Sequence, residues 1–176
     1  MANATAAGAA AHFLPDGAAR AIFGEDPAAT VGGQFAPRGA GVREGNGWRV
    51  SGSFSFGSGT AHSVYVTAGS LPPEDGKPVT EPSGLPRMLA AFFPRDQIAF
   101  TDNWHVMGLR GTGSYDYEVR GLHVPDEFAF RLFEKSPRHE SAVYRMGMMP
   151  ITASGHAAWA LGVGRRALDE LRAMAH

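Results

Sequence analysis

Residues 48–56 read WRVSGSFSF, the clearest strand pattern in the chain. Trp48, Val50, Phe54 and Phe56 alternate there with arginine and serine, the period-two pattern of a strand that is buried on one face. Just upstream, residues 44–47 read EGNG. An Asn-Gly pair between two extended segments is the strongest short-range signal for a β-hairpin. The stretch therefore predicts a hairpin whose second strand is half-buried.

The same periodicity continues along residues 31–125 and predicts several more strands. They are expected at residues 63–68, 88–93, 98–104, 115–119 and 121–124. Residues 71–86 contain five prolines and are predicted to form a surface loop. Short strands separated by turn signals are typical of a barrel or a sandwich, so the chain is expected to be mainly β.

Helical patterns flank this region on both sides. Residues 2–23 are rich in alanine and interrupted at Pro15, and Asp16 is expected to be the N-cap of a short helix over residues 18–23 that Gly24 ends. Residues 128–134 are expected to form a turn of helix. Residues 151–175 have apolar side chains at helical spacing and predict an amphipathic helix, which needs a surface to pack against.

Composition excludes several classes of protein. The chain has 176 residues, 23 glycines, 12 prolines and a formal net charge of −1, which offers no electrostatic footprint for a nucleic acid. There are no cysteines, so disulfides and thiolate chemistry are excluded, and a cytoplasmic location is expected. No apolar run approaches the ~20 residues that a membrane span needs. We therefore expect neither a nucleic-acid nor a membrane partner.

The residues alone do not identify a chemical reaction. The seven histidines have no carboxylate or second histidine at metal-ligand spacing, so no metal site is expected. Residues 111–114 read GTGS, but a phosphate-binding loop would need a lysine and a following helix. Without further information the chain is a mostly-β domain with a helical appendix.

Three segments resemble a known family. Residues 47–59 read GWRVSGSFSFGSG, residues 102–114 read DNWHVMGLRGTGS, and residues 121–125 read GLHVP. These strings are similar to the middle β-domain signatures of the acyl-CoA dehydrogenase superfamily. The second is closest in form to the flavin-dependent monooxygenase branch of two-component hydroxylases, which residues 12–15 and 32–37 also resemble.

The resemblance implies a fold and an activity. The expected fold is a Greek-key β-barrel with flanking helices: residues 1–30 as an N-terminal helical remnant, 31–127 as the middle barrel domain, and 128–176 as a connection plus the first helix of a truncated C-terminal bundle. The expected activity is that of an oxidoreductase, a monooxygenase that uses O2 and reduced FMN or FAD from a separate flavin reductase. A small-molecule substrate and a homo-oligomer are also implied.

The resemblance further implies residues that would hold the flavin. Ser58 would donate a hydrogen bond to the N5 and C4-carbonyl edge of the ring, and Phe56 would line the ring. Gln34, Phe35 and Ala36 fall where dehydrogenases bind the pyrimidine edge. Since Phe35 replaces a hydroxyl residue there, only backbone groups and the Gln34 side chain are left for these contacts.

The roles of two further residues stay open. Arg110 either faces the flavin or its phosphates, or ties strand ends together through backbone carbonyls. Trp104 either covers a substrate or flavin face, or is a core tryptophan. Ser58 and Phe56 likewise have a purely structural alternative, a turn residue and a core aromatic. No catalytic residue is assigned.

Two other functions stay open at this point. The chain could be a non-catalytic barrel that serves as an assembly or ligand-binding module. It could also be an acyl-CoA dehydrogenase that binds a CoA thioester, although Phe35 and residues 104–114 argue against this. The flavin hypothesis requires that the segments around Ser58 and Arg110 converge on one cleft of the size of an isoalloxazine ring.

Overall fold

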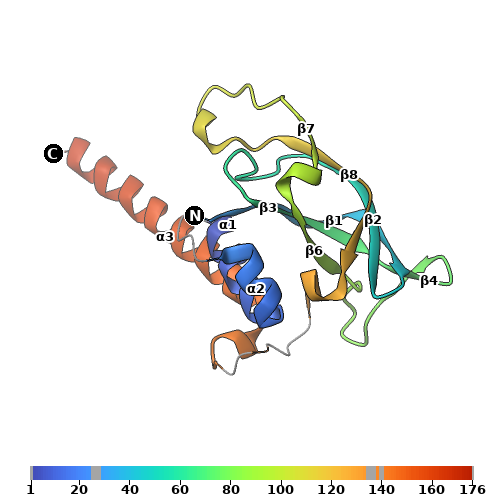
Figure 1. The fold of residues 1–176 in the computed structure, drawn as a ribbon. Helices are drawn as coiled ribbons and strands as arrows, with labels where there is room; N and C mark the ends of the chain where they lie inside the picture. The colour runs from blue at the N-terminus through green and yellow to red at the C-terminus, as the bar shows by residue number, and fades with distance from the viewer. Residues whose placement is uncertain (1, 25–28, 134–137, 139–140, 176) are drawn as a thin grey trace.

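The computed structural model describes residues 2–24, 29–133, 138 and 141–175. A curved β-sheet forms the body of the molecule, two short helices lie beside it, and a long helix projects away from it (Figure 1). The helices are α1 (Ala2–Ala10), α2 (Asp16–Phe23) and α3 (Met148–Met174). Each helix in this part of the chain is too short or too polar to traverse a lipid bilayer.

Nine strands are assigned in the described residues. They are β1 (Val31–Glu44), β2 (Gly47–Phe54), β3 (Tyr65–Leu71), β4 (Pro73–Glu74), β5 (Lys77–Pro78), β6 (Leu89–Pro94), β7 (Ala99–Thr101), β8 (Asp116–Pro125) and β9 (Ala129–Arg131). Seven of them form one sheet in the order β7-β8-β2-β1-β3-β6-β9, in which only the pairing of β1 with β3 is parallel. The predicted mainly β fold with flanking helices is confirmed.

The sheet curls without closing. Strands β6 and β8 contact each other although they are not neighbours in the sheet order. Among the described strands, however, the edge strands β7 and β9 do not pair, and each has only three residues. A closed barrel has no free edge. The expected Greek-key barrel is therefore not confirmed, and the sheet is open in this structure.

The predicted hairpin is present as β1 and β2. Glu44 pairs with Gly47, so the two-residue turn consists of Gly45 and Asn46 rather than of the Asn-Gly pair itself. Gly45 has a φ of +57°, and Asn46 does not have a positive φ. A glycine at the first turn position is the signature of a type II′ turn, which matches the twist of the flanking strands.

The concave side of the sheet encloses the first of two hydrophobic clusters. Phe54 and Tyr117 stack with ring centroids 4.9 Å apart. Val50, Val66 and Phe93 pack around them. Alternate residues of β2 supply this cluster, as the period-two pattern of residues 48–56 predicts.

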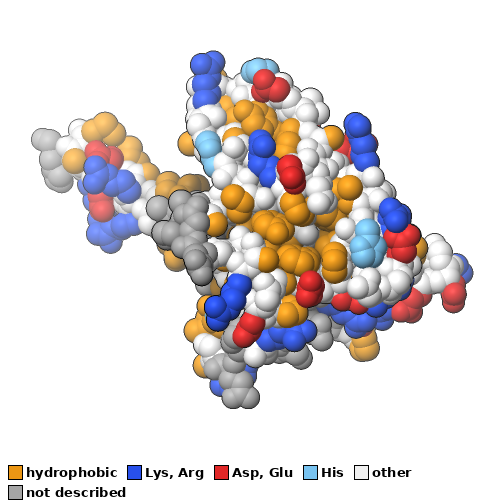
Figure 2. Space-filling view, in the orientation of Figure 1, with side chains coloured by type: hydrophobic (Ala, Val, Ile, Leu, Met, Phe, Trp, Pro, Cys, Tyr) orange, Lys and Arg blue, Asp and Glu red, His pale blue; other side chains and the backbone are white. Residues whose placement is uncertain are grey.

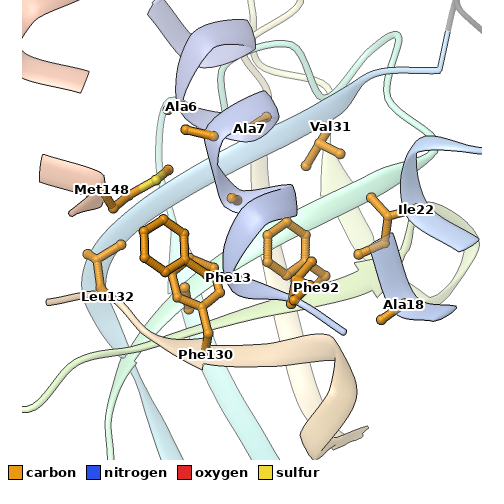
Figure 3. Close-up of a cluster of buried hydrophobic side chains, with 14 of the residues drawn as sticks. Ala6, Ala7, Phe13, Ala18, Ile22, Val31, Phe92, Phe130, Leu132 and Met148 are labelled. Atoms are coloured by element: carbon orange, nitrogen blue, oxygen red, sulfur yellow. The ribbon is translucent and has the colours of Figure 1, made fainter. Parts of the chain in front are cut away.

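The second cluster lies between the sheet and the helices. Figure 3 shows α1, which carries the buried Ala6 and Ala7, beside the sheet, and Phe13 near Phe130. The rings of Phe13 and Phe130 stack at 5.4 Å. Met148, the first residue of α3, joins the same cluster. The two flanking helical segments are thus anchored to one face of the sheet.

Two local predictions are wrong. Helix α2 begins at Asp16 with Pro15 at the N-cap, so Asp16 lies inside the first turn and does not cap it. The expected helical turn at residues 128–134 is instead a 3₁₀ turn (Asp126–Phe128) followed by β9, which pairs with β6; residue 134 lies outside the described residues. The open edge of β6 explains this result, because it offers backbone partners that local sequence does not reveal.

Other predictions are confirmed with shifted bounds. Residues 71–86 form a mostly exposed excursion that contains only the small β4–β5 hairpin. The two strands expected at residues 115–124 are one strand, β8, with a register shift opposite residues 50–52 and a φ of +63° at Gly121. Helix α3 matches the helix predicted over residues 151–175, but it begins three residues earlier, at Met148, and ends at Met174.

Candidate functional site

Two loops meet at one end of the sheet. The serine loop, residues 55–63, follows β2, and the tryptophan loop, residues 102–115, connects β7 to β8. Because β2 pairs with β8, these loops leave the sheet side by side. The backbone N–H of Gly57 donates to the carbonyl of Tyr115 at 2.9 Å, and that of Ala61 donates to the carbonyl of Gly113 at 3.2 Å. The segments around Ser58 and Arg110 therefore converge.

Side chains reinforce this contact. The buried hydroxyl of Thr60 donates to the carbonyls of Gly57 at 2.8 Å and Gly113 at 3.2 Å. The imidazole Nε2 of His62 lies 2.8 Å from the carbonyl oxygen of Gly111. Since a carbonyl only accepts, Nε2 carries the proton in this contact. The serine loop thus fixes the position of the second half of the tryptophan loop.

The tryptophan loop also has internal hydrogen bonds. The Nε1–H of Trp104 donates to the carbonyl of Leu109 at 3.2 Å, and the hydroxyl of Thr112 donates to the same carbonyl at 2.8 Å. Leu109 has a φ of +58°, a left-handed conformation that non-glycine residues rarely adopt. Such strained residues cluster at functional sites, where the surrounding structure holds them in place.

A cleft of about 780 Å³ lies between these loops and the helices. This volume is within the ~300–1,000 Å³ that is usual for small-molecule sites. Lysine, arginine, aspartate and glutamate are all absent from the described lining. The lining residues are Ala7, Gly8, Phe23, Ala29, Thr30, Val31, Ser58, Gly59, His62, Trp104, Leu109, Thr112, Ser114 and His156.

Three of the predicted site residues lie at or beside this cleft. Ser58 and Trp104 line it from opposite loops. Phe56 is next to it, with its ring edge-on to that of Trp104 at a centroid distance of 6.3 Å. Phe56 is 70% exposed, so it is not a core aromatic. The carbonyl of Ser58 accepts the N–H of Gly33 at 3.0 Å, which joins the serine loop to β1.

Gln34 is tied to the serine loop but is not part of the lining. Its side-chain Nε2 donates to the carbonyl of Ser55 at 2.7 Å, and its backbone N–H donates to the phenol oxygen of Tyr117 at 3.1 Å. Tyr117 in turn donates to the carbonyl of Thr67 at 2.5 Å. Burial of the phenol raises the pKa of Tyr117 well above its usual value, so the group stays neutral.

The other three predicted residues are not among the described residues that line the cleft. Phe35 packs edge-on to Phe92, 6.3 Å away, within the cluster beneath the helices. Ala36 lies with Phe35 in an irregular part of β1, where the register with β3 shifts between Gln34 and Pro37. The Nε–H of the exposed Arg110 donates to the carbonyl of Val106 at 3.0 Å, a contact within the tryptophan loop that joins no strand ends, so both alternatives for this residue stay open.

Five polar residues of the lining, Thr30, His62, Thr112, Ser114 and His156, were not predicted. Thr112 and Ser114 belong to the quoted GTGS string, and His62 follows the string of residues 47–59 by three positions, so considering whole loops rather than single positions would have found them. Thr30 lies just before β1, outside every quoted string. His156 comes from α3, far along the chain, and the sequence contains no signal that would bring it to Ser58.

The lining suits a planar, largely neutral ring. Apolar side chains and an indole provide its walls, and the hydroxyls of Ser58 and Ser114 add polar groups that suit ring heteroatoms, whereas the Thr112 hydroxyl already donates to the carbonyl of Leu109. The phosphate of a flavin would need cationic or backbone partners, and the described lining supplies only two imidazoles. The residues present therefore fit the isoalloxazine better than the phosphate end of the cofactor.

Comparison with known proteins is consistent with this chemistry. No family model matches the chain. The flavin-dependent monooxygenase oxygenase subunit HsaA of Mycobacterium tuberculosis is 38% identical over 104 residues, which are 59% of this chain and 25% of that protein. The indole-3-acetate monooxygenase of Pseudomonas putida is 31% identical over 155 residues, 88% of this chain and 38% of that protein.

A solved structure shows the same fold over nearly the whole chain. XiaF from Streptomyces sp., in complex with FADH2 and glycerol, superimposes with a TM-score of 0.72 and 25% identity over 95% of this chain and 43% of XiaF. The chain thus spans less than half the length of these relatives. The predicted resemblance is confirmed: over the part of their length that it spans, this chain is related to the oxygenase subunits of flavin-dependent monooxygenases, the hydroxylase branch of the acyl-CoA dehydrogenase superfamily.

Proposed function

We propose that this chain is the flavin-binding β-domain of a monooxygenase oxygenase component and that its cleft holds the ring of reduced FMN or FAD. The observation that carries the proposal is the convergence of the serine and tryptophan loops on one cleft of suitable size. Its relatives include the oxygenase component of an FADH2-dependent resorcinol hydroxylase of Rhizobium sp., 33% identical over 115 residues.

The residues of the chain would have distinct tasks. Ser58 would donate a hydrogen bond to the polar edge of the ring, Trp104 would cover one face, and Phe56 would extend this wall at the side. Gln34 would act on the ring only by holding the serine loop through Ser55. Phe35 and Ala36 would contact the ring only through backbone groups, and Arg110 would reach it only by leaving the carbonyl of Val106.

The overall reaction would insert one oxygen atom of O2 into a small-molecule substrate and release the other as water. The bound reduced flavin would supply the two electrons and activate the oxygen. The protein would orient the ring and exclude water, and helices α1 and α3 would contribute to this through Ala7, Gly8 and His156, which line the cleft. A separate flavin reductase would deliver the reduced cofactor.

We also propose a domain division and a homo-oligomer. Residues 31–127 would form the middle domain of the family, with the open, curled sheet as its counterpart of the Greek-key barrel; β9 pairs with β6, so we extend this domain to Arg131. Residues 1–30 and the remainder of 128–176 would be the helical flanks. Beyond Thr152, α3 is exposed and carries apolar side chains, which supports packing against a second copy.

Anaerobic titration tests the flavin proposal. Reduced FMN and FADH2 are titrated into the chain, and binding is followed by calorimetry. We expect Ser58→Ala to weaken binding about 2- to 10-fold, the effect of one lost hydrogen bond. Ser53→Ala, an exposed serine on β2, is the control and should bind normally. Failure of the unmodified chain to bind either reduced flavin at high micromolar concentration would reject the proposal in favour of a non-catalytic module.

A further inference from the structure

Phe56 has a strained backbone and an exposed aromatic ring. Its φ of +59° lies in the left-handed region, which is costly for a residue with a large side chain. Its ring is 70% exposed, so burial of the ring does not compensate for this cost. The surrounding structure must therefore hold Phe56 in place.

Asp116 provides the restraint. Its carboxylate Oδ1 accepts the backbone N–H of Phe56 at 2.9 Å. Its own N–H donates to the side-chain Oδ1 of Asn103 at 3.1 Å. Hydrogen bonds to an ionised carboxylate are stronger than those between neutral groups. One residue at the start of β8 thus connects the serine loop to the first half of the tryptophan loop.

The restraint determines where the Phe56 ring lies. In this conformation the ring is edge-on to Trp104, with an interplanar angle of 89° and a centroid distance of 6.3 Å. Trp104 is itself fixed by its Nε1 hydrogen bond to Leu109 and lines the cleft. The two side chains form a preformed aromatic wall, which a flat ligand can contact without first ordering it.

We propose that Asp116 is a positioning residue: it holds Phe56 in its left-handed conformation so that Phe56 and Trp104 together form an aromatic wall for a planar ring at the cleft. The identity of that ring as an isoalloxazine rests on the proposed function. The position of the wall does not, since it follows from the contacts of Asp116, Phe56 and Trp104 within the chain.

A purely structural role for Asp116 predicts different behaviour. If Asp116 only stabilises the start of β8, its loss should lower the stability of the whole chain and leave the wall unchanged in the molecules that stay folded. If Asp116 positions Phe56, its loss should let the Phe56 ring move away from Trp104 in molecules that are still folded. A local reporter on the wall separates these two cases.

Trp104 can be that reporter. The chain has three tryptophans, and Trp48→Phe together with Trp159→Phe leaves Trp104 as the only one. In this background we expect Asp116→Ala to increase acrylamide quenching of Trp104 and to weaken binding of reduced FMN roughly tenfold, the effect of one charge-assisted hydrogen bond. Asp116→Asn keeps an oxygen that can accept the backbone N–H of Phe56. It should therefore bring both the quenching of Trp104 and the affinity for reduced FMN most of the way back to their original values. Asp102→Ala, an exposed acid in the same loop, is the control.

Phe56→Gly provides an independent test that does not depend on the folding of the Asp116 variants. Glycine adopts a positive φ without strain, so this variant should be more heat-stable than the unmodified chain. It also removes half of the wall, so it should bind reduced FMN several-fold more weakly. If the strained backbone of Phe56 serves binding, the variant should gain stability and lose affinity for reduced FMN. If the phenylalanine has only a structural role, the variant should lose stability.

Several outcomes would overturn the inference. Unchanged Trp104 quenching in folded Asp116→Ala would show that the carboxylate does not hold the wall. So would a failure of Asp116→Asn to restore it at equal stability, or normal FMN binding by Phe56→Gly. If the unmodified chain binds no reduced flavin, the proposed function fails, but the quenching comparison still decides whether Asp116 positions Phe56.

Discussion

The Nε2 atom of His62 lies 2.8 Å from the carbonyl oxygen of Gly111, and this contact joins the two loops that carry the candidate flavin site. His62 comes four residues after Ser58, and Gly111 lies in the turn that follows Leu109. Both His62 and Thr112, the neighbour of Gly111, line the cleft. The imidazole therefore has two roles: it connects the two loops, and it is part of the surface that lines the cleft.

Loss of the His62 imidazole should loosen the tryptophan loop. We expect His62→Ala to weaken binding of reduced flavin about 2- to 10-fold, since one neutral hydrogen bond between the loops is lost. Amide hydrogen exchange should become faster in residues 104–112 and stay unchanged in β3 and β6. His105→Ala is the matched control, because His105 is exposed and its imidazole has no hydrogen bond in the described structure. Equal flavin affinity in the two variants would contradict the connecting role.

The hydroxyl of Tyr117 should be important for stability. It donates to the carbonyl of Thr67 and accepts the N–H of Gln34, so Tyr117→Phe leaves two backbone groups without this partner. We expect the free energy of unfolding to fall by about 1–3 kcal/mol, measured by urea denaturation. Tyr115→Phe, two residues away in a half-buried position, should change it much less. Similar losses in both variants would argue against a special role for Tyr117.

The same phenol should give a distinctive response to alkaline pH. Burial raises the pKa of Tyr117 above the ordinary value of 10.0. Above pH 10 the unfolded chain loses this proton while the folded chain keeps it, so the unfolded state binds fewer protons and the free energy of unfolding declines. Urea denaturation between pH 9 and 11 should show a decline that is steeper in the unmodified chain than in Tyr117→Phe, by up to about 1.4 kcal/mol per pH unit. Parallel curves would contradict this assignment.

Much of the sheet could be predicted because its pattern is local. The alternation in residues 48–56 and the glycine-rich turn before it specify β2 and the hairpin without reference to the rest of the chain. Helix α3 is long and periodic enough to be predicted within three residues of its start. By contrast, β9 has only three residues and exists because the edge of β6 is available to it.

The candidate site was predictable only in part, for a similar reason. Ser58 and Trp104 lie in long signature strings, and the structure places both at one cleft. The packing of the Phe35 side chain under the helices depends on which face of β1 they cover, which the sequence does not show, and the predicted backbone contacts of this residue stay a prediction. His156 reaches the cleft only through the docking of α3 on α1, which no local pattern encodes.

Two hydroxyls on β3 should respond in opposite ways to removal. Ser70 is completely buried, and its Oγ has no hydrogen-bond partner in the described structure. Ser70→Ala should therefore leave the free energy of unfolding unchanged or raise it by up to about 1 kcal/mol. The Thr67 hydroxyl, also buried, donates to the carbonyl of Gly32 at 3.1 Å. Thr67→Val should lower stability by about 1 kcal/mol. A loss in Ser70→Ala as large as that in Thr67→Val would contradict the assignment of Ser70.

The projecting part of α3 should control self-association. Figure 2 shows hydrophobic side chains along this helix beside its charged ones, and Trp159 and Val163 are 66% and 51% exposed. These two residues are one helical turn apart and share a face with the small residues Ala158, Gly162 and Ala167. If that face packs against a second copy, Trp159→Gln combined with Val163→Gln should shift the chain toward the monomer in sedimentation velocity experiments. Val42→Gln, which removes an apolar side chain that is 57% exposed on β1, should not. An oligomer that persists in the double variant, or a chain that is monomeric throughout, would show that α3 does not mediate assembly.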